Sequence, residues 1–148
     1  MALAKTISII PTVLLGGLSG LHVAWARGNT VPFDSAKELA VNVTGQKTPP
    51  EPGPTAVVAG ALGAGALLSA GVGQRSWFGR LARRVLMLAF AGRAVMGYRG
   101  STLEVLGWKA NKKFAENDRR VFGPLCAVIA VGLFFSDPAW RRKPAPKN

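Results

Sequence analysis

Apolar residues along the chain gather into four long blocks, each separated from the next by a segment that carries charged residues. The blocks lie at about residues 6–26, 54–73, 81–98 and 119–135. A helix of roughly 20 residues crosses the hydrocarbon core of a bilayer, about 30 Å thick, and each block approaches that length. The pattern predicts an all-α fold: a four-helix transmembrane bundle in which residues 1–148 form one integral membrane domain.

The four blocks differ in where they carry charge. The first has no charged residue between Lys5 and Arg27, and the second has none at all. The third contains Arg93, and the fourth begins among charged residues next to Asp118. The third and fourth helices are therefore expected to have polar or charged ends. The apolar part of the fourth, residues 121–135, is short, so this helix must begin within its charged flank, tilt, or thin the bilayer.

The first block has an alternative interpretation as a cleaved signal peptide. Lys5 precedes an apolar core, and Ala24-Trp25-Ala26 has the small-x-small pattern of a peptidase site.

The segments between the blocks are rich in proline and in basic residues. Residues 27–53 predict an irregular connector with one short helix at 35–39, started by Asp34 as N-cap. A second short helix is expected at about 109–117. Residues 74–84 hold four arginines with two aromatic residues and no acid, which suits a layer of anionic lipid headgroups. A basic tail occupies residues 141–148.

Composition supports a membrane protein and argues against other classes. The chain is 49% hydrophobic yet carries 19 Lys and Arg against 7 Asp and Glu, a formal net charge of +12. A nucleic-acid-binding protein would be basic but less apolar, so no nucleic-acid partner is expected. One cysteine, Cys126, and one histidine, His22, are too few for a disulfide within the chain or a zinc site.

The predicted crossings place several polar residues at one depth. The first and third helices end at the same membrane face, and the fourth begins there. His22 precedes Arg27 by five residues and Arg93 precedes Arg99 by six, so both lie about 7 to 9 Å below that face. A buried arginine needs a partner, and Asp118 is the acid best placed to provide one. We predict a polar pocket made of His22, Trp25, Arg93, Arg99 and Asp118.

Simpler alternatives apply to the same residues. Arg93 could snorkel to headgroup phosphates, and His22 could donate a single hydrogen bond to a backbone carbonyl. The small residues have a packing interpretation, since Gly16 and Gly20, and likewise Gly60 with Ala64, are spaced for close helix approach.

Motifs that are absent limit the functions that remain. The chain lacks a phosphate-binding G-x-x-x-x-G-K-[ST] loop, paired metal ligands, and any acid inside an apolar block. We expect no catalytic residue, metal or cofactor. Two functions stay open: a non-catalytic membrane protein or accessory subunit bound to other membrane subunits, and a protein or enzyme that handles a small molecule, lipid or anion in the polar pocket. A basic protein held on anionic lipid only by charge is the alternative to insertion.

Basic residues do not decide the orientation by number, because they divide equally between the two predicted sides. The arginines of residues 74–84 lie close to a helix end, where the positive-inside effect is strongest. We therefore expect both termini in the cytoplasm.

Three motifs lie at predicted helix ends. They are His22-x-x-Trp25-Ala26-x-Gly28, then Arg93 with Gly97 and Arg99-Gly100, then Phe114-Ala115-x-x-Asp118 followed by Pro124-Leu125-Cys126. In this order they resemble a family of bacterial integral membrane proteins catalogued as domain of unknown function 3995. Where members of that family carry a Tyr-Ser pair before the proline, this chain has Phe122-Gly123. The resemblance implies a four-helix protein of the bacterial inner membrane, and it implies no activity.

Overall fold

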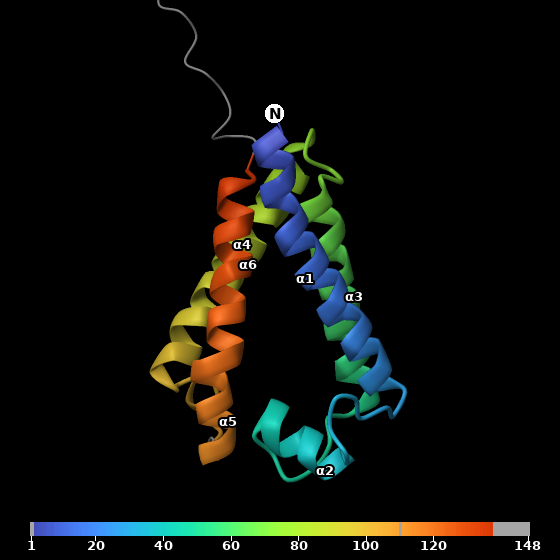
Figure 1. Ribbon diagram of the computed structural model, residues 1–148, viewed down its shortest axis with the longest axis vertical. Helices are drawn as coiled ribbons and strands as arrows, with labels where there is room; N and C mark the ends of the chain where they lie inside the picture. The colour runs from blue at the N-terminus through green and yellow to red at the C-terminus, as the bar shows by residue number, and fades with distance from the viewer. Residues whose placement is uncertain (1, 110, 138–148) are drawn as a thin grey trace, which may run out of the picture.

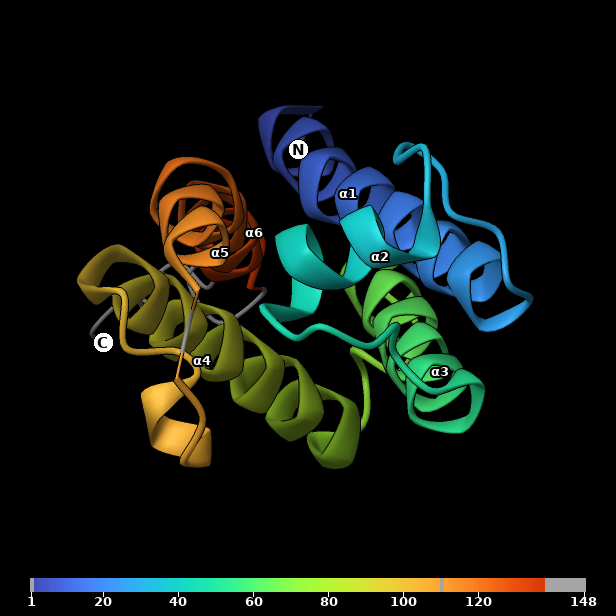
Figure 2. The same cartoon turned by 90° about the horizontal axis from the view of Figure 1, so that it is seen from below.

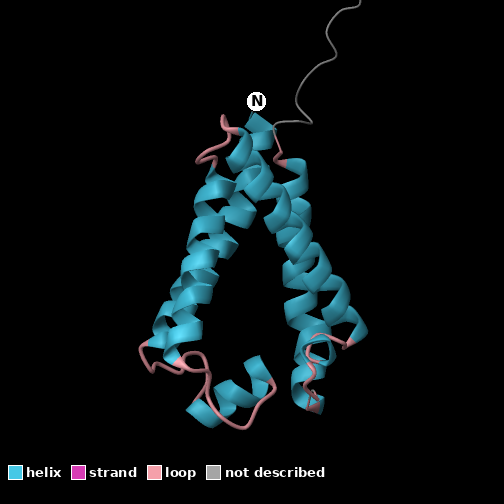
Figure 3. Ribbon diagram, turned by 180° about the vertical axis from the view of Figure 1, so that it is seen from behind, coloured by secondary structure: helices cyan, strands magenta, loops and turns pink. Residues whose placement is uncertain are grey.

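The computed structural model describes residues 2–109 and 111–137. These residues form helices joined by loops, with no strand among them, which confirms the predicted all-α class (Figure 3). The main helices are α1 (Ala2–Ala26), α3 (Pro52–Ala70), α4 (Trp77–Arg99) and α6 (Gly123–Phe135). Shorter elements are α2 (Ala36–Leu39), α5 (Lys112–Asn117), the π-helical turns η1 (Ala40–Thr44) and η3 (Asp118–Phe122), and the 3-10 turn η2 (Glu104–Leu106). The predicted basic tail lies outside the described residues.

Capping side chains set the starts of α2, α4 and α5. The hydroxyl of Ser76 accepts a hydrogen bond from the Gly79 N–H at 3.0 Å at the start of α4. Asn111 caps α5 in the same way, accepting from the Phe114 N–H at 2.8 Å. The short helix predicted at 35–39 is present, but Ser35 caps it rather than Asp34, because the Ser35 hydroxyl reaches the N–H three residues ahead.

The main helices form two pairs that lean together at one end and diverge at the other (Figure 1). α1 packs along α3, and α4 packs along α6. The pairs are joined through a core whose buried centre is Leu15, Ile129 and Leu133. Side chains of α3 and α4 pack against that centre, so all four helices share one core. The connector that holds α2 lies between the diverging ends (Figures 1 and 2).

The fourth apolar block belongs to a longer helical segment. α5, η3 and α6 follow one another without a break from Lys112 to Phe135. Pro124 explains the π-helical turn, since it has no N–H to donate and its ring would clash with the carbonyl four residues back. Widening the turn, with the Gly123 N–H bonded to the Asp118 carbonyl five residues back, makes room for the ring. The whole segment is about 36 Å long and begins within the charged flank of the apolar block.

Glycines at the close helix crossings differ from those predicted. Gly16, Gly20 and Gly60 lie on exposed faces, and a Cβ on any of them would meet no atom within 4 Å. A four-residue spacing marks a common face without saying whether that face turns inward, so these glycines make no close crossing within the chain. The tight approach of α1 and α6 forms at Gly132, where a Cβ would lie 2.9 Å from Cδ of Pro11.

We expect Gly132→Ala to lower stability by about 1–3 kcal/mol, because the new methyl overlaps a proline ring that cannot rotate away. Gly16→Ala adds its methyl to open space and should be neutral or stabilising by up to about 1 kcal/mol, since alanine favours helix. Thermal unfolding of both variants in one mild detergent tests this. A loss of stability in Gly16→Ala equal to that in Gly132→Ala would contradict the assignment of the crossing.

Candidate functional site at the connector end of the helices

A buried ion pair joins α4 to the start of η3. The Nη2 of Arg93 donates to Oδ1 of Asp118 at 2.6 Å. The side chain of Asp118 is 1% exposed and that of Arg93 is 28% exposed, so the carboxylate depends on this partner for its charge balance. The sequence predicted this pairing from the shared depth of the two residues, and the ion pair is present.

Thr102 closes the ion pair into a three-residue network. The Nη1 of Arg93 donates to Oγ1 of Thr102 at 3.0 Å, and the Thr102 hydroxyl donates to Oδ2 of Asp118 at 2.5 Å. Each side chain therefore bonds to the other two, and both carboxylate oxygens have a donor. Such saturation is what a buried pair needs to offset the loss of water. The sequence analysis missed Thr102, because it is uncharged and follows α4 in an irregular segment.

Glycines let the two backbones come close enough for this network. A Cβ on Gly97 would lie 2.9 Å from Nη1 of Arg93, 3.0 Å from Oδ1 of Asp118 and 3.2 Å from Cα of Gly123. Any side chain at Gly97 would therefore compete with the ion pair for space. This gives a physical reason for glycine one turn after Arg93 in the motif.

The structure places the other predicted pocket residues away from the ion pair. The rings of His22 and Trp25 lie 4.8 Å apart at the end of α1. Nδ1 of His22 donates to the Leu18 carbonyl at 2.8 Å, and Nε1 of Trp25 donates to the Val31 carbonyl at 2.7 Å. Arg99 is exposed. His22 thus makes the single backbone hydrogen bond of the simpler alternative.

The five predicted residues are therefore divided between two helix pairs. His22 and Trp25 belong to the α1–α3 pair, whereas Arg93 and Asp118 belong to the α4–α6 pair, and the pairs diverge at this end (Figure 2). No hydrogen bond or ion pair joins His22 to Arg93 within the described part of the chain. The position of a residue along a helix gives its distance from the helix end, but it does not say which other helices lie beside it. The five residues predicted to form one pocket are therefore not all neighbours in the structure.

A second arginine of α4 is buried at the opposite end. Arg83 is 4% exposed, and its Nη1 donates to the Leu68 carbonyl at 2.9 Å and the Ser69 carbonyl at 3.4 Å. Its Nη2 donates to the Ser136 hydroxyl just after α6. The cation thus lies at the carboxyl ends of two helices, where the helix dipole is negative. The expectation that the arginines of residues 74–84 face lipid headgroups is wrong for Arg83.

Arg83 and Arg93 lie on one stripe of α4. The members of the stripe recur every three or four residues and turn toward the other helices: Gly79, Arg83, Leu86, Phe90, Arg93 and Gly97. Arg84 lies off this stripe, its side chain is 54% exposed, and its Nε lies 3.4 Å from Oδ2 of Asp137. The spacing was therefore a signal, present in the sequence, that Arg83 turns inward and Arg84 does not.

Comparison with known families decides the relationship of the chain. The family described as protein of unknown function (DUF3995) matches residues 15–133. The chain belongs to this family. No curated protein and no solved structure matches it. The DUF3995 match runs from the middle of α1 almost to the end of α6, so it contains both buried arginines and Asp118. Among the described residues, no group of three or more His, Cys, Asp or Glu side chains is placed to hold a metal ion.

Proposed function

We propose that the protein is an integral membrane protein of the bacterial inner membrane, with four crossings and a non-catalytic role as a structural or accessory subunit. The observation that carries the proposal is the exposure of large apolar side chains on all four main helices. Representative members are Ile9, Ile10 and Val13 on α1, Val57 and Leu67 on α3, Val85, Leu88 and Val95 on α4, and Val128, Val131 and Phe135 on α6. Water would drive such surfaces to aggregate, whereas lipid tails solvate them.

Two of the helices support the proposal by length and composition. Ser8–Ala26 and Pro52–Ala70 are long and apolar enough to cross a membrane. Only 17% and 22% of these stretches is buried within the protein, whereas the core helix of a soluble protein is mostly buried. α4 fits the same proposal although it carries charge, because Arg83 and Arg93 both have polar partners within the protein.

The Arg93–Thr102–Asp118 network favours a structural role over ligand handling. Both carboxylate oxygens of Asp118 accept hydrogen bonds within the network, so an anionic ligand that replaced the carboxylate would have to break them. The alternative function, a ligand pocket that also uses His22 and Trp25, gains no support from residues that lie on different helix pairs. We infer that the network locks α4 against the helical segment that begins at Lys112.

Orientation follows from the same proposal. The start of α1 and the end of α6 lie at one end of the molecule (Figure 1), so both termini face the same side of the membrane. We infer that this side is the cytoplasm, since the adjacent segment 74–84 is basic and contains no acid. With Arg83 buried, the inference rests on Arg75, Arg80 and Arg84.

Washing membranes of expressing bacteria with alkaline carbonate should leave the protein in the pellet, because inserted helices are not held by charge alone. A protein bound only to anionic headgroups would be released by carbonate or by high salt, and release would overturn the proposal.

Alkaline phosphatase fused to the C-terminus should be inactive in intact cells. Full phosphatase activity would reverse the orientation and leave the four crossings unchanged.

A further inference from the structure

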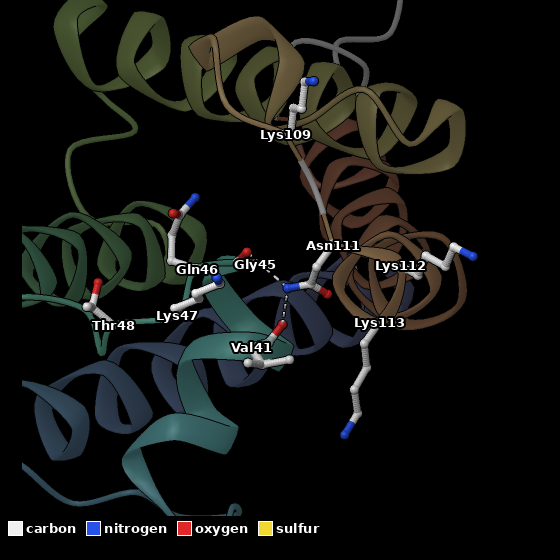
Figure 4. Close-up of a pocket in the computed structure, with 9 residues that line it drawn as sticks. All are labelled: Val41, Gly45, Gln46, Lys47, Thr48, Lys109, Asn111, Lys112 and Lys113. Carbon is white, nitrogen blue, oxygen red and sulfur yellow. Dashed lines mark hydrogen bonds between the residues drawn. The ribbon is translucent and has the colours of Figure 1, made fainter.

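An open pocket of about 690 Å³ lies at the end where the helix pairs diverge (Figure 4). It lies between the connector that joins α1 to α3 and the segment that joins α4 to α6. One wall comes from η1 and the residues after it, and the other comes from the start of α5. Its lining contains four lysines and no acid: Val41, Gly45, Gln46, Lys47, Thr48, Lys109, Asn111, Lys112 and Lys113. A volume of this size accommodates small molecules, which bind in pockets of about 300–1,000 Å³.

Hydrogen bonds between the connectors build the floor of the pocket. The Nδ2 of Asn111 donates to the Gly45 carbonyl at 2.9 Å and to the Val41 carbonyl at 3.2 Å (Figure 4). A second amide, from Asn117, donates to Oδ1 of Asn42 at 2.9 Å. Gly45 fits tightly here, since its φ is +70° and a Cβ would lie 2.6 Å from Cδ1 of Leu103. Segments some 70 residues apart in sequence are thus locked together, so the pocket has a defined shape.

The positive charge of the pocket is not neutralised by ion pairs within the described part of the chain. In the described part of the chain, none of its four ammonium groups lies within 4.0 Å of a carboxylate. The neighbouring surface differs, because there Arg120 is paired with Glu116 at 3.0 Å. In Figure 4 Lys112 and Lys113 extend from α5 in different directions, as consecutive residues of a helix do. An anion with several oxygen atoms would supply a counter-charge to more than one of these lysines.

We propose that this lysine pocket binds a phosphate group, carried either by the headgroup of an anionic phospholipid or by a soluble phosphate compound. Lysine ammonium groups on flexible stems can turn toward phosphate oxygens, and the side chains of Gln46 and Thr48 add neutral donors. The position at the helix ends places the pocket at the level of the headgroups if the four helices cross the bilayer. The lipid source therefore rests on the proposed function, whereas the soluble source does not.

Native mass spectrometry of the full-length protein in a neutral detergent tests the proposal. Phosphatidylglycerol is titrated as the anionic probe, phosphatidylcholine as the zwitterionic comparison and inorganic pyrophosphate as the soluble probe. The pocket variant combines Lys47→Gln, Lys112→Gln and Lys113→Gln. The control variant removes the same number of charges from exposed positions outside the pocket and outside the basic segment 74–84: Arg27→Gln, Lys37→Gln and Arg99→Gln.

We expect the pocket variant to raise the apparent Kd for phosphatidylglycerol by up to about 100-fold, since each of the three lysines would contribute about a fivefold factor. The control variant should change it less than about threefold. Lys→Arg at the same three pocket positions keeps the charge and should keep binding. Binding of phosphatidylglycerol without competition by pyrophosphate identifies a lipid headgroup, and tight pyrophosphate binding identifies a soluble phosphate.

Two results would overturn the proposal. An equal loss of binding in the pocket and control variants would mean that net charge alone attracts the anion. Equal retention of phosphatidylglycerol and phosphatidylcholine, together with no pyrophosphate binding, would mean that the pocket does not recognise phosphate. Because pyrophosphate needs no membrane, its result stands even if carbonate releases the protein from membranes.

Discussion

Replacing Arg93 with leucine should cost about 3–5 kcal/mol of stability, the largest loss expected from any single substitution considered for this protein. The substitution leaves the carboxylate of Asp118 buried, with only the Thr102 hydroxyl to balance it. Thermal unfolding in one mild detergent measures the effect. Arg99→Leu serves as the matched control, because Arg99 belongs to the last turn of the same helix and is exposed, and we expect it to be nearly neutral.

The double variant distinguishes pairing from simple loss of a side chain. Asp118→Asn alone removes the charge but keeps the shape, so it should cost about 1–3 kcal/mol. Combined with Arg93→Leu, it should recover about 1–3 kcal/mol relative to the sum of the two single effects, as coupled buried partners do. Strict additivity would show that the two residues contribute independently. A neutral or stabilising Arg93→Leu would instead support an arginine that snorkels to headgroups.

At the other end of α4, Arg83→Met should lower stability by about 2–4 kcal/mol. The substitution removes charge-assisted hydrogen bonds to the last turn of α3 and to Ser136, and such bonds contribute about 1.5–3 kcal/mol each where they are buried. Arg84→Met is the control from the neighbouring position, and it should cost less than about 1 kcal/mol, because its ion pair with Asp137 is largely exposed on the arginine side.

The comparison of these neighbours, again by thermal unfolding, tests the inward stripe of α4. Ser136→Ala removes one partner of Arg83 and should reproduce part of its effect. Equal losses in Arg83→Met and Arg84→Met would mean that the carboxyl ends of α3 and α6 do not depend on the buried guanidinium.

Much of the fold was predictable because one physical requirement shapes most of the chain. Long apolar blocks between charged segments favour helices, since a helix satisfies its own backbone hydrogen bonds within one segment. The Arg93–Asp118 ion pair was also predictable, because helix rise converts residue number into depth and a buried charge needs a partner. The start of α5 was harder to place, since it depends on the Asn111 cap rather than on the first charged residue.

Lateral arrangement could not be predicted in the same way. Depth put His22 level with Arg93, yet the divergence of the two helix pairs separates them, and that divergence depends on contacts among all four helices. The role of Thr102 could not be predicted, because the sequence of an irregular segment does not distinguish a buried threonine from a solvent-exposed one. The burial of Arg83 could have been predicted from its spacing from Arg93, which places both residues on one face of the helix. The basic segment around Arg83 and Arg84 instead led to the prediction that both arginines lie at the membrane surface.

The π-helical turn has a consequence for insertions and deletions in the chain. In a regular α-helix, residues five apart point about 140° away from each other. Asp118 and Gly123 nevertheless both face α4, because the wide turn brings the fifth residue back beneath the first. A chain one residue shorter here, with an ordinary turn, would also hold such an acid and glycine on one face, since residues four apart are neighbours. The wide turn therefore accommodates the extra residue before Pro124 while the carboxylate of Asp118 still faces Arg93. An acid and a glycine separated by four residues in a regular turn, or by five residues in a π-helical turn, would both face α4.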